Sequence, residues 1–184
     1  MSVTDGIVLA GWIVFWMYWL AASVGVKAAA RPRRAEFVGF RVAVVLGVLL
    51  LLRAGAFKAH ANPLANSVLR GIGLALFVAG LALAVWARVY LGRNWGTPMS
   101  QKIEPELVTT GPYRRVRHPI YSGIILGVIG TAIAVGLYWL VTVVLLGAYF
   151  IYSAIVEERN MAALFPDTYP GYKRSTTMLI PFVL

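Results

Sequence analysis

The chain has 184 residues, of which 60% are hydrophobic and 13% are charged, whereas soluble domains average about 25% charged residues. It has no cysteine and only two histidines, which excludes disulfides, thiolate metal sites, cysteine nucleophiles and His-rich metal centres, so no bound metal is expected. The formal net charge of +10 would suit a nucleic acid or a membrane surface, and the position of the charges decides between them.

Five apolar runs predict membrane-spanning helices, because each meets or approaches the roughly 20 residues that cross a bilayer. In chain order they cover residues 7–26, 37–57, 69–91, 120–135 and 137–156. The first run lacks a basic leader and a cleavage site, so it is expected to be a retained helix rather than a signal peptide. Gly136 alone separates the last two runs, which predicts a tight helical hairpin.

The basic residues predict the orientation of these helices. If the N-terminus is outside, fourteen of the 17 Lys and Arg residues lie on the cytoplasmic side, and only Arg53, Lys58 and Arg70 lie on the other. The positive-inside rule favours this arrangement, with the C-terminus and the active site in the cytoplasm. Topology and anionic lipid headgroups therefore explain the charge, and no nucleic-acid partner is expected.

A long polar segment, residues 92–118, follows the third run. Its glycines and prolines predict a loop with turns, and loops of this length within compact proteins are usually functional or disordered. Its aromatic and apolar side chains favour an ordered loop. Pro119 is typical of a first helical position, so the backbone N–H groups that follow should face this loop and favour an anion.

The predicted hairpin brings ionisable residues from two distant segments to one membrane face. One wall of the resulting pocket is expected to hold Arg117, His118, Tyr121 and Tyr113, and the other Glu157 or Glu158. Adjacent helical residues diverge by about 100°, so only one of the two glutamates is expected to face the pocket. These groups suit S-adenosylmethionine, a nucleotide or a phospholipid headgroup, and the residues alone do not choose among the three.

Several ordered motifs carry a family resemblance. They are Gly111-Pro112-Tyr113, Arg117-His118-Pro119-x-Tyr121, Glu157-Glu158, Leu164-Phe165, and Tyr169-x-x-Tyr172-Lys173 followed by Pro181. Together they resemble the integral-membrane methyltransferases, which include isoprenylcysteine carboxyl methyltransferases and phospholipid methyltransferases. The resemblance covers residues 88–184 and implies S-adenosylmethionine as cofactor. It implies that the cofactor is held by Leu107, Val108, Tyr113, His118, Pro119, Ile120, Tyr121 and Glu157.

The same resemblance suggests which residues take part in the chemistry and which contact the methyl acceptor. Arg117 and Glu158 are the candidate catalytic residues, and Glu158 or His118 could accept a proton from an amine or thiol acceptor. Ser153 and Trp95 are the candidate substrate contacts. The isoprenylcysteine enzymes have an arginine at the position of Ser153, so its replacement favours a neutral or amine-bearing lipophilic acceptor.

We therefore expect an all-α membrane protein with five transmembrane helices, a tight hairpin between the last two, and a cytoplasmic cofactor pocket closed by the C-terminal segment. Residues 1–184 are expected to form one domain, with residues 1–68 as scaffold and residues 69–184 carrying the site. The expected function is methyl transfer to a lipophilic acceptor taken from the bilayer. The alternatives are a non-enzymatic lipid- or nucleotide-binding module and, less favoured because the apolar spans lack mid-depth ionisable residues, a small transporter subunit.

Overall fold

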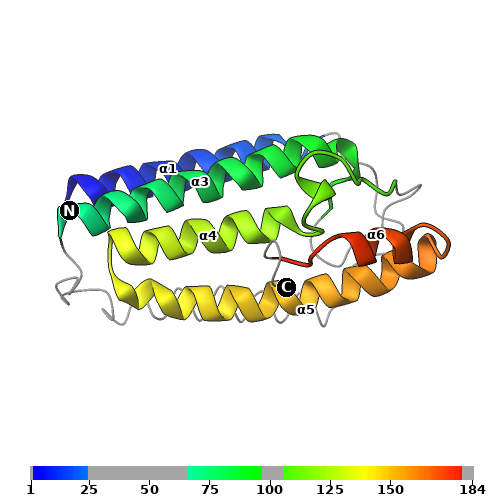
Figure 1. Cartoon of the computed structure of the whole chain (residues 1–184). Helices are drawn as coiled ribbons and strands as arrows, with labels where there is room; N and C mark the ends of the chain where they lie inside the picture. The colour runs from blue at the N-terminus through cyan, green and yellow to red at the C-terminus, as the bar shows by residue number, and fades with distance from the viewer. Residues whose placement is uncertain (1, 25–65, 97–105, 180–184) are drawn as a thin grey trace.

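The computed structural model describes residues 2–24, 66–96 and 106–179, and this part of the chain is helical. The helices are α1 (Val3–Ala21), α3 (Ser67–Leu91), α4 (Pro119–Ala134), α5 (Leu140–Leu164) and α6 (Tyr169–Ser175), with short 3₁₀ turns η1 (Gly92–Asn94), η2 (Gly111–Arg114) and η3 (Leu137–Trp139). Figure 1 shows α1 beside α3, α4 between α3 and α5, and α6 folded back along the end of α5. The expected all-α architecture is confirmed in these segments.

Three of the described helices are long and apolar enough to cross a membrane: Val3–Ala21, Ser67–Asn94 and Leu137–Leu164. The helix α4 has 16 residues, roughly 24 Å at 1.5 Å per residue, which is shorter than the about 30 Å of bilayer hydrocarbon. The expected second span, residues 37–57, lies outside the described residues. The count of five spans therefore stays a prediction.

Capping residues set where the first two described helices begin. Ser2 and Asp5 form a capping box, in which the Ser2 hydroxyl accepts from the Asp5 N–H at 3.2 Å and the Asp5 carboxylate accepts from the Ser2 N–H at 2.8 Å. This pair satisfies N–H groups that the first turn leaves free, so α1 starts four residues before the apolar run that predicted it. At α3, the Asn66 side chain accepts from the Leu69 N–H at 2.7 Å.

Glycines bring α3 and α4 into backbone contact. A Cβ atom on Gly123 would lie 2.6 Å from the Gly80 carbonyl oxygen, and one on Gly73 would lie 2.6 Å from the Ala134 nitrogen. Small residues at such positions let helices pack closely where lipid gives no hydrophobic driving force. The position of α4 relative to α3 is therefore set by backbone shape.

The ends of α4, α5 and α6 that carry the candidate site lie together. Figure 1 shows α4 and α5 running antiparallel, joined by residues 135–139. The start of α4 and the far end of α5 consequently share one end of the molecule, where α6 packs on α5. The helix α5 continues past Glu157 and Glu158 to Leu164, and Phe165 is its C-cap.

Candidate active site

The helix α4 begins with backbone donors free to meet a ligand. Pro119 occupies its first position and His118 its N-cap, as predicted. The first intrahelical bond runs from the Ser122 N–H to the His118 carbonyl, at 3.1 Å. The N–H groups of Ile120 and Tyr121 precede this bond, so they belong to the unsatisfied, electropositive end of the helix.

Both glutamates of the α5 pair reach the His118 ring. Nδ1 of His118 lies 3.5 Å from Oε2 of Glu157, and Nε2 lies 3.6 Å from Oε1 of Glu158. The expectation that only one glutamate faces the site was therefore wrong. The imidazole lies between the two carboxylates, and two long side chains diverging by about 100° can approach it from opposite edges.

This arrangement controls the protonation of His118. Burial by itself lowers the pKa of the imidazole, but the nearby carboxylates of Glu157 and Glu158 outweigh burial, and the pKa is raised above 6.5. Opposite charges within about 4–6 Å favour the charged form of a titratable group. The site thus favours an imidazolium held between two carboxylates.

The Tyr121 ring is nearly parallel to two neighbouring rings, His118 and Phe150. It lies 5.4 Å from the His118 ring at an interplanar angle of 5°, and 4.4 Å from the Phe150 ring at 8°. Its hydroxyl donates to Oε1 of Glu157 at 2.7 Å. Tyr121 is only 8% exposed, and its hydroxyl orients Glu157.

Arg117 and Glu158 form a buried ion pair that involves the C-terminal segment. Nε of Arg117 lies 2.6 Å from Oε1 of Glu158, with the side chains 8% and 3% exposed, and Lys173 Nζ contacts Oε2 of Glu158 at 2.7 Å. Nη1 of Arg117 also donates to the backbone carbonyls of Lys173, at 3.2 Å, and Thr176. The two candidate catalytic residues therefore contact each other and the residues around α6.

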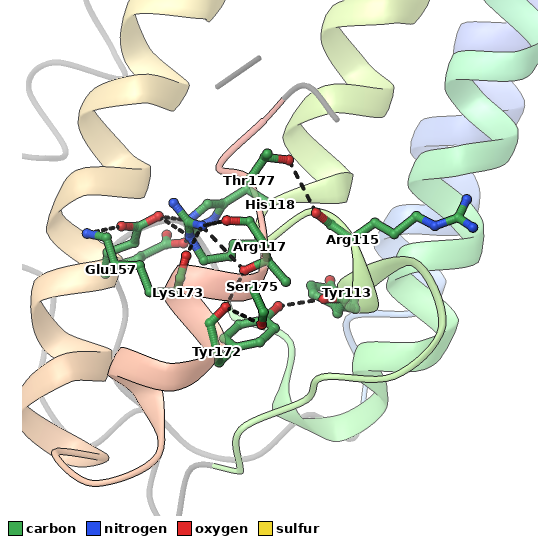
Figure 2. A network of polar contacts seen from close by, with 11 residues as sticks. Tyr113, Arg115, Arg117, His118, Glu157, Tyr172, Lys173, Ser175 and Thr177 are labelled. Atoms are coloured by element: carbon green, nitrogen blue, oxygen red, sulfur yellow. Dashed lines mark hydrogen bonds and ion pairs between the residues drawn. The ribbon is translucent and has the colours of Figure 1, made fainter. Parts of the chain in front are cut away.

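Residues after α6 pair with the chain just before α4, in a contact that the sequence did not predict. Val116 and Thr177 form an isolated parallel bridge. The Arg117 N–H donates to the Thr177 carbonyl at 2.9 Å, and the His118 N–H to the Met178 carbonyl at 3.0 Å. Figure 2 shows Thr177 beside the Arg115 carbonyl, to which its hydroxyl donates at 3.2 Å, with the Arg115 side chain directed away from His118. A bridge this short has no periodic signature that could reveal it.

Tyr113 and Tyr172 join the η2 turn to α6. The Tyr172 hydroxyl donates to the Tyr113 carbonyl at 2.7 Å (Figure 2). Burial is the main cause that raises the pKa of Tyr172 to about 12, so its hydroxyl stays protonated and able to donate. Burial likewise raises the pKa of Tyr113, which packs in one apolar cluster with Val108 and Trp95. Leu107 is half-buried beside Val108.

The two candidate substrate residues lie in different surroundings. Ser153 is fully buried, and its hydroxyl donates to the Tyr149 carbonyl at 2.8 Å within α5, one turn before Glu157. Trp95 lies beyond the end of α3, edge-on to Trp19 of α1 at 5.9 Å. In the described segments neither side chain bonds to the His118 cluster, so their contact with an acceptor stays a prediction.

The site offers one accessible carboxylate beside helix-end donors. The Glu157 side chain is 24% exposed, whereas that of Glu158 is 3% exposed. Glu157 can therefore accept from hydroxyl groups or attract a cation, next to N–H groups that suit an anion. Within residues 2–24, 66–96 and 106–179, no group of three or more His, Cys, Asp or Glu residues could hold a metal ion.

Comparison with known proteins shows the family to which the chain belongs. The family model described as phospholipid methyltransferase matches residues 69–168, which is more than half of the chain and includes the His118 and Glu157 segments. The chain belongs to this family of integral-membrane methyltransferases.

The relatives are similar over roughly half of their own length. The nickel-cobalt-cadmium resistance protein NccN of Alcaligenes xylosoxydans xylosoxydans is 31% identical over 60% of this chain and 52% of its own. The protein-S-isoprenylcysteine O-methyltransferase of Schizosaccharomyces pombe is 28% identical over 64% of this chain and 51% of its own. The solved eukaryotic intramembrane Ras methyltransferase ICMT shares the fold, with a TM-score of 0.57 and 21% identity over 84% of this chain and 55% of that one.

Proposed function

We propose that the protein transfers a methyl group from S-adenosylmethionine to a lipophilic acceptor that reaches the site from the bilayer. The observation that carries the proposal is the Glu157 carboxylate, oriented by Tyr121 and accessible beside the free N–H groups at the start of α4. This donor and acceptor set lies inside the residues that match the family.

The residues present fit the charges of S-adenosylmethionine. Its amino acid carboxylate suits the Ile120 and Tyr121 N–H groups, because the helix start favours an anion. Its hydroxyls or its positive groups suit Glu157. Leu107, Val108 and Tyr113 would border the nucleoside part of the cofactor. When bound, the cofactor supplies a sulfonium methyl group that is open to in-line displacement.

The contribution of the chain to such a displacement is mainly positional. Methyl transfer from a sulfonium needs alignment and exclusion of water more than covalent help. Arg117 and Glu158 are suited to holding the C-terminal segment against α4, so we propose that they act as positioning residues. Their ion pairing, and the imidazolium form of His118, make Glu158 and His118 poor proton acceptors. This favours an acceptor that reacts already deprotonated.

The lipophilic acceptor and the orientation are supported by the surface and the charge pattern. Large apolar side chains are exposed along α1, α3 and α5, which suits a surface in contact with lipid. Position 153 in α5 is an uncharged serine rather than an arginine. This favours an acceptor that is recognised without a cation there. Fourteen of the 17 Lys and Arg residues are expected on the same side of the membrane as the site. We therefore propose that the site faces the cytoplasm and that the N-terminus lies outside.

Calorimetry with S-adenosylhomocysteine on the detergent-purified protein tests the proposal. We expect binding by the intact chain and at least a tenfold loss, about 1.4 kcal/mol, in Glu157→Gln and in His118→Gln. Asp167→Asn is the matched control, because Asp167 is exposed and lies beyond α5. Absence of binding by the intact chain, or equal binding by all variants, would contradict the proposal. Binding without methyl transfer to any lipid would favour the non-enzymatic alternative.

A further inference from the structure

Arg88 is a buried cation in the last turn of α3 that contacts the ends of two helices. It is 4% exposed. Its Nη2 donates to the carbonyl of Ala22, the C-cap of α1, and its Nη1 to the carbonyl of Gly92, the C-cap of α3, at 2.8 Å. Both carbonyls lie at negative helix ends, which stabilise a cation. Arg88 therefore fixes the end of α1 against the turn that follows α3.

The guanidinium of Arg88 also orders Trp95. Its Cζ lies 4.7 Å from the Trp95 ring centroid, a favourable cation–π distance, and Trp95 in turn meets Trp19 of α1. Nε of Arg88 is buried without a partner, and no carboxylate pairs with this guanidinium in the described segments. A buried charge paired this incompletely is a weak source of stability, which points to a role in geometry.

The turn held by Arg88 is connected to the segment that carries the candidate cofactor residues. The Gly92 carbonyl accepts from Arg88 and also from the Trp95 N–H, at 3.3 Å. In the same turn, Nδ2 of Asn94 donates to Oε2 of Glu106 at 3.1 Å. Glu106 immediately precedes Leu107 and Val108. A continuous set of contacts thus runs from α1 through Arg88 to the start of this segment.

We propose that Arg88 is a positioning residue for the cofactor site: by tying the end of α1 to the turn after α3, it holds Glu106 and the adjoining residues Leu107 and Val108. This inference rests on the proposed function for the identity of the cofactor. It adds α1, which lies outside the residues that match the family, to the elements on which cofactor binding depends.

Arg88→Met separates a positioning role from a purely structural one. Methionine keeps much of the side-chain volume and removes the charge, and loss of an incompletely paired buried charge also removes its desolvation cost. We expect the thermal midpoint to change little, while the affinity for S-adenosylhomocysteine falls at least tenfold. Arg88→Lys keeps the charge and should recover part of the affinity. Arg70→Met, the same change at the opposite end of α3, should bind like the parent.

A spectroscopic measurement tests the tie directly. The chain has no cysteine, so Val24→Cys and Thr109→Cys place spin labels at two exposed positions, one beyond α1 and one in the segment after Glu106. We expect a narrow distance distribution by pulsed electron spin resonance in the parent and a broad one with Arg88→Met. Unchanged affinity or an unchanged distribution in Arg88→Met would overturn the inference. If the parent itself fails to bind S-adenosylhomocysteine, the proposed function fails. The distance measurement then still tests whether Arg88 holds the end of α1 near the residues that follow Glu106.

Discussion

The Tyr121 hydroxyl donates to the Glu157 carboxylate at 2.7 Å across 36 residues of sequence, while the Tyr121 ring stacks with the rings of His118 and Phe150. One side chain thus joins the start of α4 to α5 in two ways. The ring packs the apolar interior, and the hydroxyl sets the direction of the only α5 carboxylate that is partly accessible. The Tyr121 ring thus stabilises the site, whereas its hydroxyl positions Glu157 for a ligand.

Tyr121→Phe should weaken cofactor binding and leave the fold intact. The ring stack survives, but Glu157 loses a hydrogen bond of a kind that contributes about 1.5–3 kcal/mol when one partner is charged. We expect S-adenosylhomocysteine to bind at least several-fold more weakly by calorimetry, with a thermal midpoint close to that of the parent. Tyr121→Leu removes the ring as well and should lower both the affinity for S-adenosylhomocysteine and the thermal midpoint. A Phe variant that binds like the parent would show that the hydroxyl does not orient Glu157 for the ligand.

Removing both members of the Arg117–Glu158 pair should cost less than the sum of the costs of removing each one. Glu158→Gln leaves Arg117 buried without its carboxylate, and breaking a buried pair costs about 3–5 kcal/mol. The double variant Arg117→Met/Glu158→Gln should unfold at a higher denaturant concentration than additivity of the single variants predicts. Lys173→Met should cost only about 0–1 kcal/mol, because its side chain is 53% exposed and exposed pairs contribute little. Additive losses would argue against a coupled pair.

The raised pKa of His118 predicts a pH-dependent stability. Burial lowers this pKa, but the two carboxylates raise it by more, to above 6.5. A group with a raised folded-state pKa stabilises the fold fully below its unfolded pKa, and this stabilisation is lost as pH rises through the folded pKa. The free energy of unfolding should therefore decline as pH rises above 6.5 in the parent and stay flatter in His118→Gln. Parallel pH profiles for the two proteins would contradict the charged state assigned to His118.

The contact between α3 and α4 predicts opposite results for two glycine substitutions. Gly123→Ala would place a Cβ atom 2.6 Å from the Gly80 carbonyl oxygen, so the helices must separate, at a cost of about 1–3 kcal/mol or more. Gly147→Ala in α5 meets nothing within 4 Å and should be neutral or stabilising by about 0.5–1 kcal/mol. Thermal unfolding of both variants provides the measurement. Equal midpoints would show that the close approach is not needed.

Much of the fold could be predicted because apolar runs, and the residues that begin or end helices, act locally. Pro119 marked the start of α4, and the early start of α1 was readable from Ser2 and Asp5, a capping pair that the apolar run obscured. The second expected span, residues 37–57, lies outside the described residues. The apolar run over residues 120–135 predicted both ends of α4 to within one residue.

The candidate site was less predictable, because its contacts depend on tertiary placement. The motifs indicated the His118, Tyr121 and Glu157 segments, but not that both glutamates reach His118. Pairing of Thr177 with Val116 depends on how α6 folds back on α5, which no local pattern encodes. Arg88 was one of many basic residues near a helix end, and only its burial and its contacts set it apart.

Transfer of a labelled methyl group tests the central claim most directly. The purified protein, reconstituted in lipid, is incubated with methyl-labelled S-adenosylmethionine and a membrane lipid extract, and label is counted in the organic phase. The account predicts label in the organic phase with the parent and with Asp167→Asn, and at least a tenfold loss with Glu157→Gln. Organic-phase label no higher than in a protein-free control, or equal with the parent and Glu157→Gln, would contradict it.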